Sequence, residues 1–122
     1  MNTVSMSLGD RSYDIIIGSN MLEDLSVLVN EVLKASKYFF VLDSVIETTH
    51  AAAAMQSFDG EHSSCAIEAT ESEKTLATTE RIWSTMIQSG CDRHCPIIAI
   101  GGGIVGDVGG FAASSFMRGV PI

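Results

Sequence analysis

The sequence predicts an α/β fold in which a parallel, Rossmann-like sheet is flanked by helices and preceded by an N-terminal β-hairpin. Short apolar runs alternate with segments of helical periodicity, an order typical of parallel strands joined by crossover helices. Lys37–Leu42 is a nearly continuous apolar run, as expected of a strand buried on both faces. Three glycines, Gly101–Gly103, follow the last apolar run, where a strand should turn into a helix.

The N-terminal elements are a hairpin and an amphipathic helix. Thr3–Ser7 and Ser12–Ile17 are β-prone runs on either side of a Gly-Asp turn, which predicts two antiparallel strands. Apolar residues then recur at helical spacing from Leu22 to Lys34. Ser19 or Asn20 is the expected N-cap of that helix.

The middle of the chain continues the alternation. The strand that ends before Asp43 is followed by an alanine-rich helix from Ser44. A short strand is expected at Ser64–Ala69. Thr70 and Glu73 have the spacing of a capping box, so we expect a helix to start there and to end at Gln88, before a Ser-Gly pair.

The last elements surround the glycines. Pro96–Ile100 is the expected strand, and a helix of small residues should run from about Val105 to Met117. Val120–Ile122 has the composition of a further strand at its start. We therefore expect residues 1–122 to form one domain that is incomplete at its C-terminal end.

Composition excludes several function classes. The formal net charge is −8 with only seven Lys and Arg residues, which argues against nucleic acid as a partner. No apolar run approaches the roughly 20 residues of a membrane span. The N-terminus has no signal-peptide pattern, and an odd number of cysteines, three, fits a reducing compartment. These features predict a soluble, cytoplasmic protein.

The glycine-rich segment has the chemistry of a phosphate site. Gly101, Gly103 and Gly106 fit a G-x-G-x-x-G spacing at a helix start, where unpaired backbone N–H groups can bind pyrophosphate. The alternative is a tight turn that only lets the helix pack closely on the sheet. Asp43 precedes the glycines, the reverse of the usual dinucleotide order, which disfavours a standard dehydrogenase half. Asp107 is expected in the first helical turn, as an acceptor for hydroxyl groups.

The run GGGIVGDVGGFAASSFMRGVP, Gly101 to Pro121, resembles the signature of 3-dehydroquinate synthases. Glu71-Ser72-Glu73-Lys74 is similar to the family's Glu-x-x-Lys at a helix start, and Asp43 stands at the matching strand end. The resemblance covers the whole chain, but only about the first third of the family's usual length. It implies a fold truncated before the family's helical C-terminal domain.

The resemblance assigns roles to individual residues. The implied NAD contacts are Asp43, Glu71, Lys74, Gly102, Gly103, Ile104 and Asp107. Arg118 is the implied substrate contact, where a guanidinium suits an anion. Other interpretations stay open: a helix cap for Asp43, a solvated helix start for Glu71 and Lys74, and a cation at a helix end for Arg118. Val45 departs from the family, which often has a polar residue there.

The resemblance also implies an activity. In the shikimate route to aromatic amino acids, the family converts 3-deoxy-D-arabino-heptulosonate 7-phosphate, a phosphorylated keto sugar acid, to 3-dehydroquinate and phosphate. NAD and a divalent metal, zinc or cobalt, assist. The metal ligands lie in the C-terminal domain, so no metal ligand and no catalytic residue is assigned to this chain, which should be inactive alone. The complete enzyme is expected to be a homodimer.

Three alternatives remain at this stage. The chain could come from another sugar phosphate cyclase or from a polyol or glycerol phosphate dehydrogenase, or it could be a noncatalytic fragment. Separately, Cys91-Asp92-Arg93-His94-Cys95 offers three possible metal ligands on one loop, one fewer than a structural zinc site needs.

Overall fold

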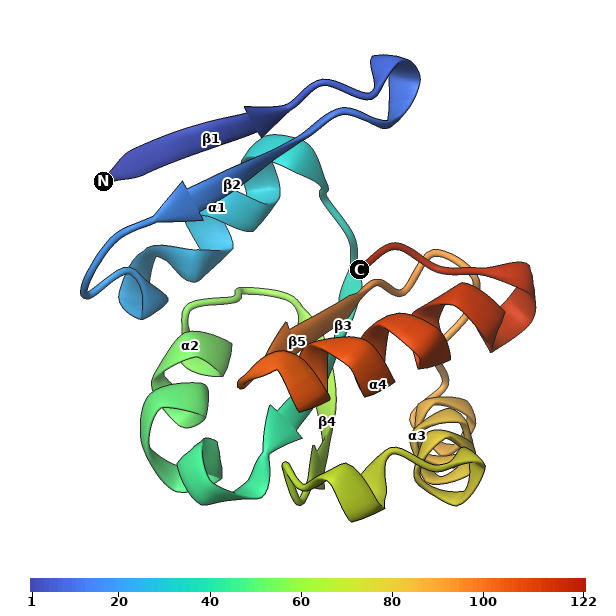
Figure 1. Cartoon of the computed structure of the whole chain (residues 1–122). Coiled ribbons are helices and arrows are strands. Elements are labelled where there is room, and N and C mark those ends of the chain that lie inside the picture. Colours follow the sequence, from blue (N-terminus) through green and yellow to red (C-terminus); the bar gives the residue numbers. More distant parts are fainter.

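The computed structural model describes all 122 residues and contains two separate sheets (Figure 1). Strands β1 (Asn2–Met6) and β2 (Tyr13–Ile17) form an antiparallel hairpin. Strands β3 (Lys37–Asp43), β4 (Glu61–Ile67) and β5 (Ile97–Ile100) form a parallel sheet in the order β4-β3-β5. The predicted α/β class, with a hairpin ahead of a parallel sheet, is confirmed.

Four α-helices accompany the sheets. They are α1 (Leu25–Val32), α2 (Ala52–Gln56), α3 (Leu76–Gln88) and α4 (Gly103–Ser115). Helix α2 lies beside one face of the parallel sheet, and α3 and α4 lie beside the other (Figure 1). No helix of the chain has the length and apolarity that would let it cross a membrane.

The central strand β3 supplies both halves of the core. Phe39 and Val41 pack into a cluster with residues of α3 and α4, including Ile82 and Val105. Tyr38, Phe40 and Leu42 pack into a second cluster with Ala51, Ala54 and Phe58, in and around α2. Because successive side chains of a strand point to opposite faces, a continuous apolar run is what a central strand needs here.

Helix α4 lies unusually close to the sheet because of its small residues. A Cβ atom on Gly109 would lie 3.3 Å from Ala99 Cβ and 3.7 Å from Val41 Cβ. Trp83 of α3 donates its indole N–H to the carbonyl of Ala112, 3.0 Å away, which joins the two helices. Close packing on the sheet, the alternative role considered for the glycines, is found at Gly109.

Two predicted helix caps are wrong. Neither Ser19 nor Asn20 caps the first helix, which begins after a 3-10 turn at Leu22–Asp24 and ends at Val32. Thr70 makes no side-chain cap bond, and only a short 3-10 turn follows it. The long helix starts later, at Leu76, where Thr75 Oγ1 accepts a hydrogen bond from Thr78 N at 3.2 Å.

The boundaries of α4 also differ from the prediction. The helix begins at Gly103, ahead of the predicted Val105, and ends at Ser115. Met117 has φ +45° and therefore cannot continue it. As a result Asp107 lies in the second helical turn, beyond the position expected from sequence.

Candidate functional site

The parallel sheet has a topological switch point between β3 and β5. The chain leaves β3 for β4 on one side and later reaches β5 on the other side. The crossovers after β3 and β5 therefore diverge to opposite faces of the sheet. Ligands of open α/β sheets bind at such a point, in the crevice outside the carboxyl ends of the strands. Asp43 ends β3 here, and Gly101 follows β5.

Gly101 is required by packing inside the chain. A Cβ atom at this position would lie 2.6 Å from Val105 Cγ2 and 3.2 Å from Asp43 Cβ. No side chain fits at such distances. The glycine thus lets the loop after β5 lie directly against the end of β3.

Packing inside the chain does not require glycine at Gly102, Gly103 or Gly106. A Cβ atom on Gly102, Gly103 or Gly106 would meet nothing within 4 Å, and none of the three has a positive φ. Open space remains above the start of α4, where the first backbone N–H groups of a helix lack intrahelical partners. The arrangement fits a pyrophosphate group, which needs both close approach and N–H donors.

A second group of residues borders this loop. Lys74 Nζ lies 2.8 Å from Asp107 Oδ2 and 3.8 Å from Glu71 Oε1. The hydrogen bond to Asp107 is the main cause that raises the pKa of Lys74, and Glu71 adds to it. Both carboxylates are mostly exposed, so their remaining oxygens can accept hydrogen bonds from a ligand. The structure therefore brings together three of the residues that the sequence predicted as NAD contacts.

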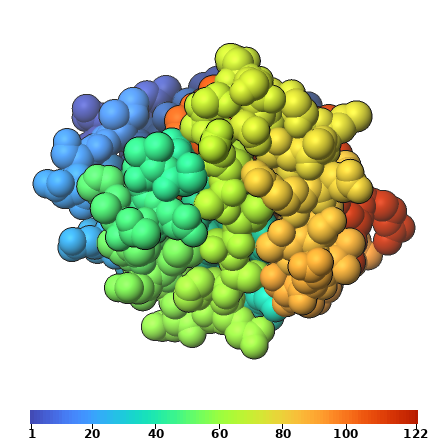
Figure 2. Space-filling model, turned by 90° about the horizontal axis from the view of Figure 1, so that it is seen from below, coloured from blue at the N-terminus to red at the C-terminus, as the bar shows by residue number.

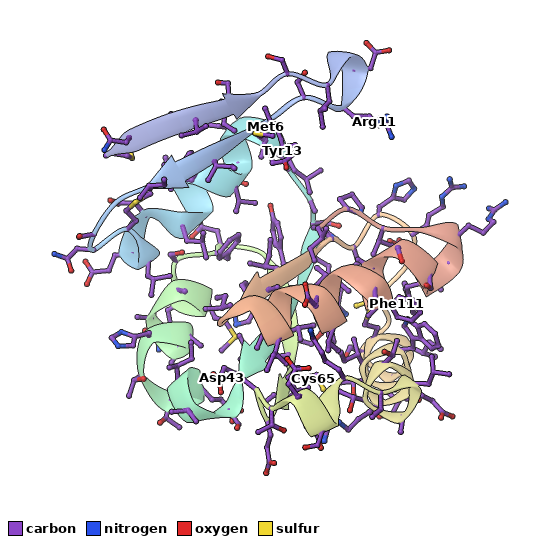
Figure 3. All side chains as sticks on the ribbon, viewed as in Figure 1. Met6, Arg11, Tyr13, Asp43, Cys65 and Phe111 are labelled. Atoms are coloured by element: carbon purple, nitrogen blue, oxygen red, sulfur yellow. The ribbon has the colours of Figure 1, made fainter.

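Beside this cluster lies a surface pocket of about 270 Å³ between the start of α3 and the exposed side of α4. Sequence reasoning missed five of its seven lining residues: Thr75, Leu76, Thr79, Val108 and Phe111. Phe111 is 49% exposed, and its side chain lies on the flank of α4 that faces α3 (Figure 3). A phenylalanine among the small residues of the glycine-rich helix was a signal available in the sequence.

A larger hollow of about 930 Å³ lies elsewhere, between β2, the turn before α1 and α2. It is lined mainly by apolar residues such as Ile16, Ile17 and Met21, with Glu23 and His50 as its ionisable groups. None of the predicted site residues borders it. We therefore place the candidate site at the carboxyl ends of the strands, where charged groups and glycines converge.

Asp43 is a cap as well as a neighbour of the glycine loop. Its Oδ1 accepts a hydrogen bond from Val45 N at 3.0 Å, so the helix-cap interpretation holds for one oxygen. The carboxylate makes no other hydrogen bond within the chain. Figure 2 views this end of the molecule, with the segments after β3 (teal) and β4 (yellow-green) side by side. Val45 itself is 82% exposed and offers no polar side chain.

Arg118 is separated from the other predicted residues. It is exposed and lies beyond the C-terminal end of α4, roughly 20 Å from the glycine loop for a helix of thirteen residues. Met117, Arg118 and Gly119 all have positive φ, at +45°, +68° and +107°. Backbone of this kind is costly for residues other than glycine and is concentrated at functional positions.

No three His, Cys, Asp or Glu side chains of this chain are grouped so that they could hold a metal ion. Cys91 and Cys95 are buried together, but His94 between them is exposed. The metal interpretation of that loop is therefore not supported.

Comparisons with known proteins identify relatives of this chain. The family profile described as 3-dehydroquinate synthase N-terminal matches residues 64–122. The 3-dehydroquinate synthase of Syntrophotalea carbinolica is 38% identical over 119 residues, which are 95% of this chain and 33% of that protein. The enzyme of the same name from Pelotomaculum thermopropionicum is 35% identical over 98% of this chain and 33% of its own length.

Two solved structures share the fold. The crystal structure of 2-deoxy-scyllo-inosose synthase with carbaglucose-6-phosphate, NAD+ and Co2+ matches with a TM-score of 0.82 and 25% identity. The match covers 98% of this chain and 33% of that one. ValA, a 2-epi-5-epi-valiolone synthase from Streptomyces hygroscopicus with NAD+ and Zn2+ bound, matches with a TM-score of 0.75, 27% identity, and coverage of 95% and 32%.

The chain thus spans about a third of the length of its curated relatives. Its second half matches the family profile, and its whole length aligns with the synthases. The chain therefore belongs with the N-terminal third of the 3-dehydroquinate synthase family.

Proposed function

We propose that this chain forms the NAD-binding part of a 3-dehydroquinate synthase. One observation carries the proposal: Gly101 is fixed by packing against Asp43, whereas Gly102, Gly103 and Gly106 face open space at the switch point of the sheet. Nothing inside the chain requires glycine at the latter three positions. A ligand that approaches the backbone closely would require it, because a side chain there would occupy the same space.

The residues at the crevice divide the recognition of NAD between them. Backbone N–H groups at Gly103 and Ile104 donate to the pyrophosphate, because a helix start offers unpaired donors. Glu71, Asp107 and the free oxygen of Asp43 accept hydrogen bonds from ribose hydroxyls. Lys74 holds Asp107 in place through their 2.8 Å contact. NAD, when bound, supplies the hydride acceptor and donor of the reaction.

In the complete enzyme the substrate is 3-deoxy-D-arabino-heptulosonate 7-phosphate, and the products are 3-dehydroquinate and phosphate. The names of the curated relatives support this substrate, and the exposed Arg118 is the group of this chain proposed to bind it. Since Arg118 lies about one helix length from the glycine loop, it contacts substrate outside the crevice that holds NAD. The divalent metal, zinc or cobalt, binds to residues outside this chain.

A second candidate is another sugar phosphate cyclase. The two structural neighbours named above, a 2-deoxy-scyllo-inosose synthase and a 2-epi-5-epi-valiolone synthase, favour it. The two candidates predict the same NAD site and differ only in substrate. The proposal also includes a homodimer in the cytoplasm, without nucleic acid or membrane as a partner.

The test is calorimetric titration of the full chain with NAD. Gly103→Val should abolish binding, because its side chain fills the open space, while the far-ultraviolet circular dichroism spectrum stays unchanged. Gly110→Ala is the matched control: it lies in the same helix, where a Cβ atom meets only Ile122 Cδ1 at 3.8 Å. Equal NAD affinity in wild type and Gly103→Val would overturn the proposal.

A further inference from the structure

Two of the three cysteines lie in direct contact. Cys91 and Cys95 are 5% and 2% exposed, and their sulfur atoms are 3.1 Å apart, with the Cys95 S–H donating to Cys91 Sγ. The third cysteine, Cys65, is also buried, and its S–H makes a 4.0 Å contact to the Ala66 carbonyl. The pair lies before β5, at the opposite end of that strand from the glycine loop, and takes no part in the proposed NAD site.

The turn between the two cysteines fixes this contact. Gly90, with φ +74°, ends α3, and Cys91 N then donates to Met86 O at 2.9 Å. Cys95 N donates to Asp92 O at 3.2 Å, and His94 N donates to Asp92 Oδ1 at 2.8 Å. Asp92 therefore closes a tight turn that folds Cys95 back onto Cys91.

A surface pocket of about 400 Å³ lies beside Cys95, whereas Cys91 does not line it. Cys95 forms part of its wall, together with Lys37, Glu61, Asp92 and His94. Lys37 also pairs with Glu61 at 3.6 Å, so groups of both charges line the opening. A small peptide disulfide, which carries ammonium and carboxylate groups, suits such a lining.

We propose that Cys91 and Cys95 are a redox-sensitive dithiol that closes to an intrachain disulfide by exchange with a low-molecular-weight peptide disulfide. A disulfide bond of about 2.05 Å requires the two sulfurs to approach by roughly 1 Å. Both cysteines belong to the turn between α3 and β5, and Cys95 borders the pocket.

The exchange occurs in two balanced steps. Cys95 loses its proton to water, and its sulfur attacks one sulfur of the external disulfide; that S–S bond breaks and releases one thiol, which takes up a proton. Cys91 then loses its proton and attacks the Cys95 sulfur of the mixed disulfide, which releases the second thiol. Two protein thiols are oxidised, and one external disulfide is reduced to two thiols.

Protonation makes the first step slow. Burial, together with the hydrogen bond to Cys91, raises the pKa of Cys95 to about 12, although the Lys37 ammonium opposes this shift. Little thiolate is present at neutral pH, so oxidation takes long exposure and the reduced pair survives brief contact with oxidant.

Oxidation of the full chain with excess glutathione disulfide tests the proposal. After acid quenching and alkylation in denaturant, the intact mass should show one alkylated thiol where the untreated chain shows three. Peptide mapping should assign the free thiol to Cys65 and the cross-link to Cys91 and Cys95. The equilibrium constant for disulfide formation should be at least about tenfold larger in the folded chain than in concentrated urea, because the fold holds the sulfurs together.

Three variants complete the test. Cys65→Ser, the matched buried control, should form the cross-link as wild type does. Cys91→Ser should stop at a stable glutathione adduct on Cys95, and Cys95→Ser should react far more slowly, since Cys91 does not line the pocket. The proposal is overturned if wild type keeps a glutathione adduct, if Cys65 enters the cross-link, or if folded and denatured chains give equal equilibrium constants; the wild-type measurements decide this even where a variant does not fold.

Discussion

Lys74 Nζ and Asp107 Oδ2 lie 2.8 Å apart and join the segment after β4 to the second turn of α4. The contact links two residues that belong to different crossovers of the sheet. It also places a positive and a negative group at the mouth of the glycine loop.

The Lys74–Asp107 pair should matter for NAD affinity more than for stability. Asp107→Asn removes the charge that orients Lys74 and should weaken NAD binding about tenfold in calorimetry, the effect of one lost charge-assisted hydrogen bond. The melting temperature should hardly change, because exposed ion pairs contribute little to stability. Arg81→Met, which breaks an ion pair with Glu73 at 3.9 Å, is the matched control and should leave NAD affinity unaltered. Equal affinity losses in both variants would contradict a specific role.

Two glycines of the same loop should respond oppositely to alanine. Gly101→Ala forces a Cβ atom within 2.6 Å of Val105 Cγ2 and should lower the free energy of unfolding by about 1–3 kcal/mol. Gly106→Ala adds a methyl group to open space inside a helix and should raise it by roughly 0.5–1 kcal/mol. Urea unfolding of both variants without ligand measures the difference. Destabilisation by Gly106→Ala would show that its surroundings are not open.

Stability should fall in alkali. The pKa of Cys95 rises from 9.0 to about 12 on folding, and those of Cys65 and Lys74 are raised as well. Because the folded state holds these protons more tightly, their contribution is complete below about pH 9 and is lost as pH increases toward 12. Urea midpoints measured across this interval should decrease less steeply for Cys95→Ser than for wild type. If the urea midpoints of wild type and Cys95→Ser decrease equally steeply with pH, the loss of stability comes from other groups.

Substitution of Arg118 should lower kcat/KM for the substrate and leave the affinity for NAD unchanged. In a protein completed with the C-terminal two thirds of the Syntrophotalea carbinolica relative, Arg118→Lys should reduce kcat/KM by an amount equivalent to about 1–3 kcal/mol. Lysine keeps the charge but lacks the planar fork that binds an anion through two hydrogen bonds. NAD affinity should be unchanged, and Arg93→Lys, another exposed arginine, is the control. A wild-type kcat/KM with an altered melting temperature would assign Arg118 to the helix end.

Strands β3 and β5 could be predicted because their patterns are strong and local, whereas β4 was predicted only in part. It was expected at Ser64–Ala69 and spans Glu61–Ile67, because its first residues are polar and carry no apolar signal. The run at β3 has no polar interruption, and the glycines after β5 mark the turn into α4. The N-cap of α3 could not be predicted, because Thr70 and Thr75 both offer a hydroxyl group before a helical pattern. The structure uses Thr75 because Lys74, with ψ 70°, interrupts the helix between them.

The residues of the site were named from the sequence, but their contacts were not. Lys74 reaches Asp107 because the segment before α3 and helix α4 lie on the same face of the sheet, which no local pattern encodes. The cysteine loop shows the same limit. Its spacing was compatible with a metal site, and only the burial of both sulfurs and the exposure of His94 distinguish a thiol pair from a set of ligands.

The strand order β4-β3-β5 has a consequence for how the chain folds. Asp43, Lys74 and Gly101 follow three different strands, so the crevice does not exist until all three have paired. Any molecule held there binds the assembled sheet and not the open chain, and it shifts the folding equilibrium by mass action. Recognition and folding are then one thermodynamic event: saturating ligand should raise the temperature at which β3, β4 and β5 separate, and should protect the amide hydrogens of all three strands from exchange together.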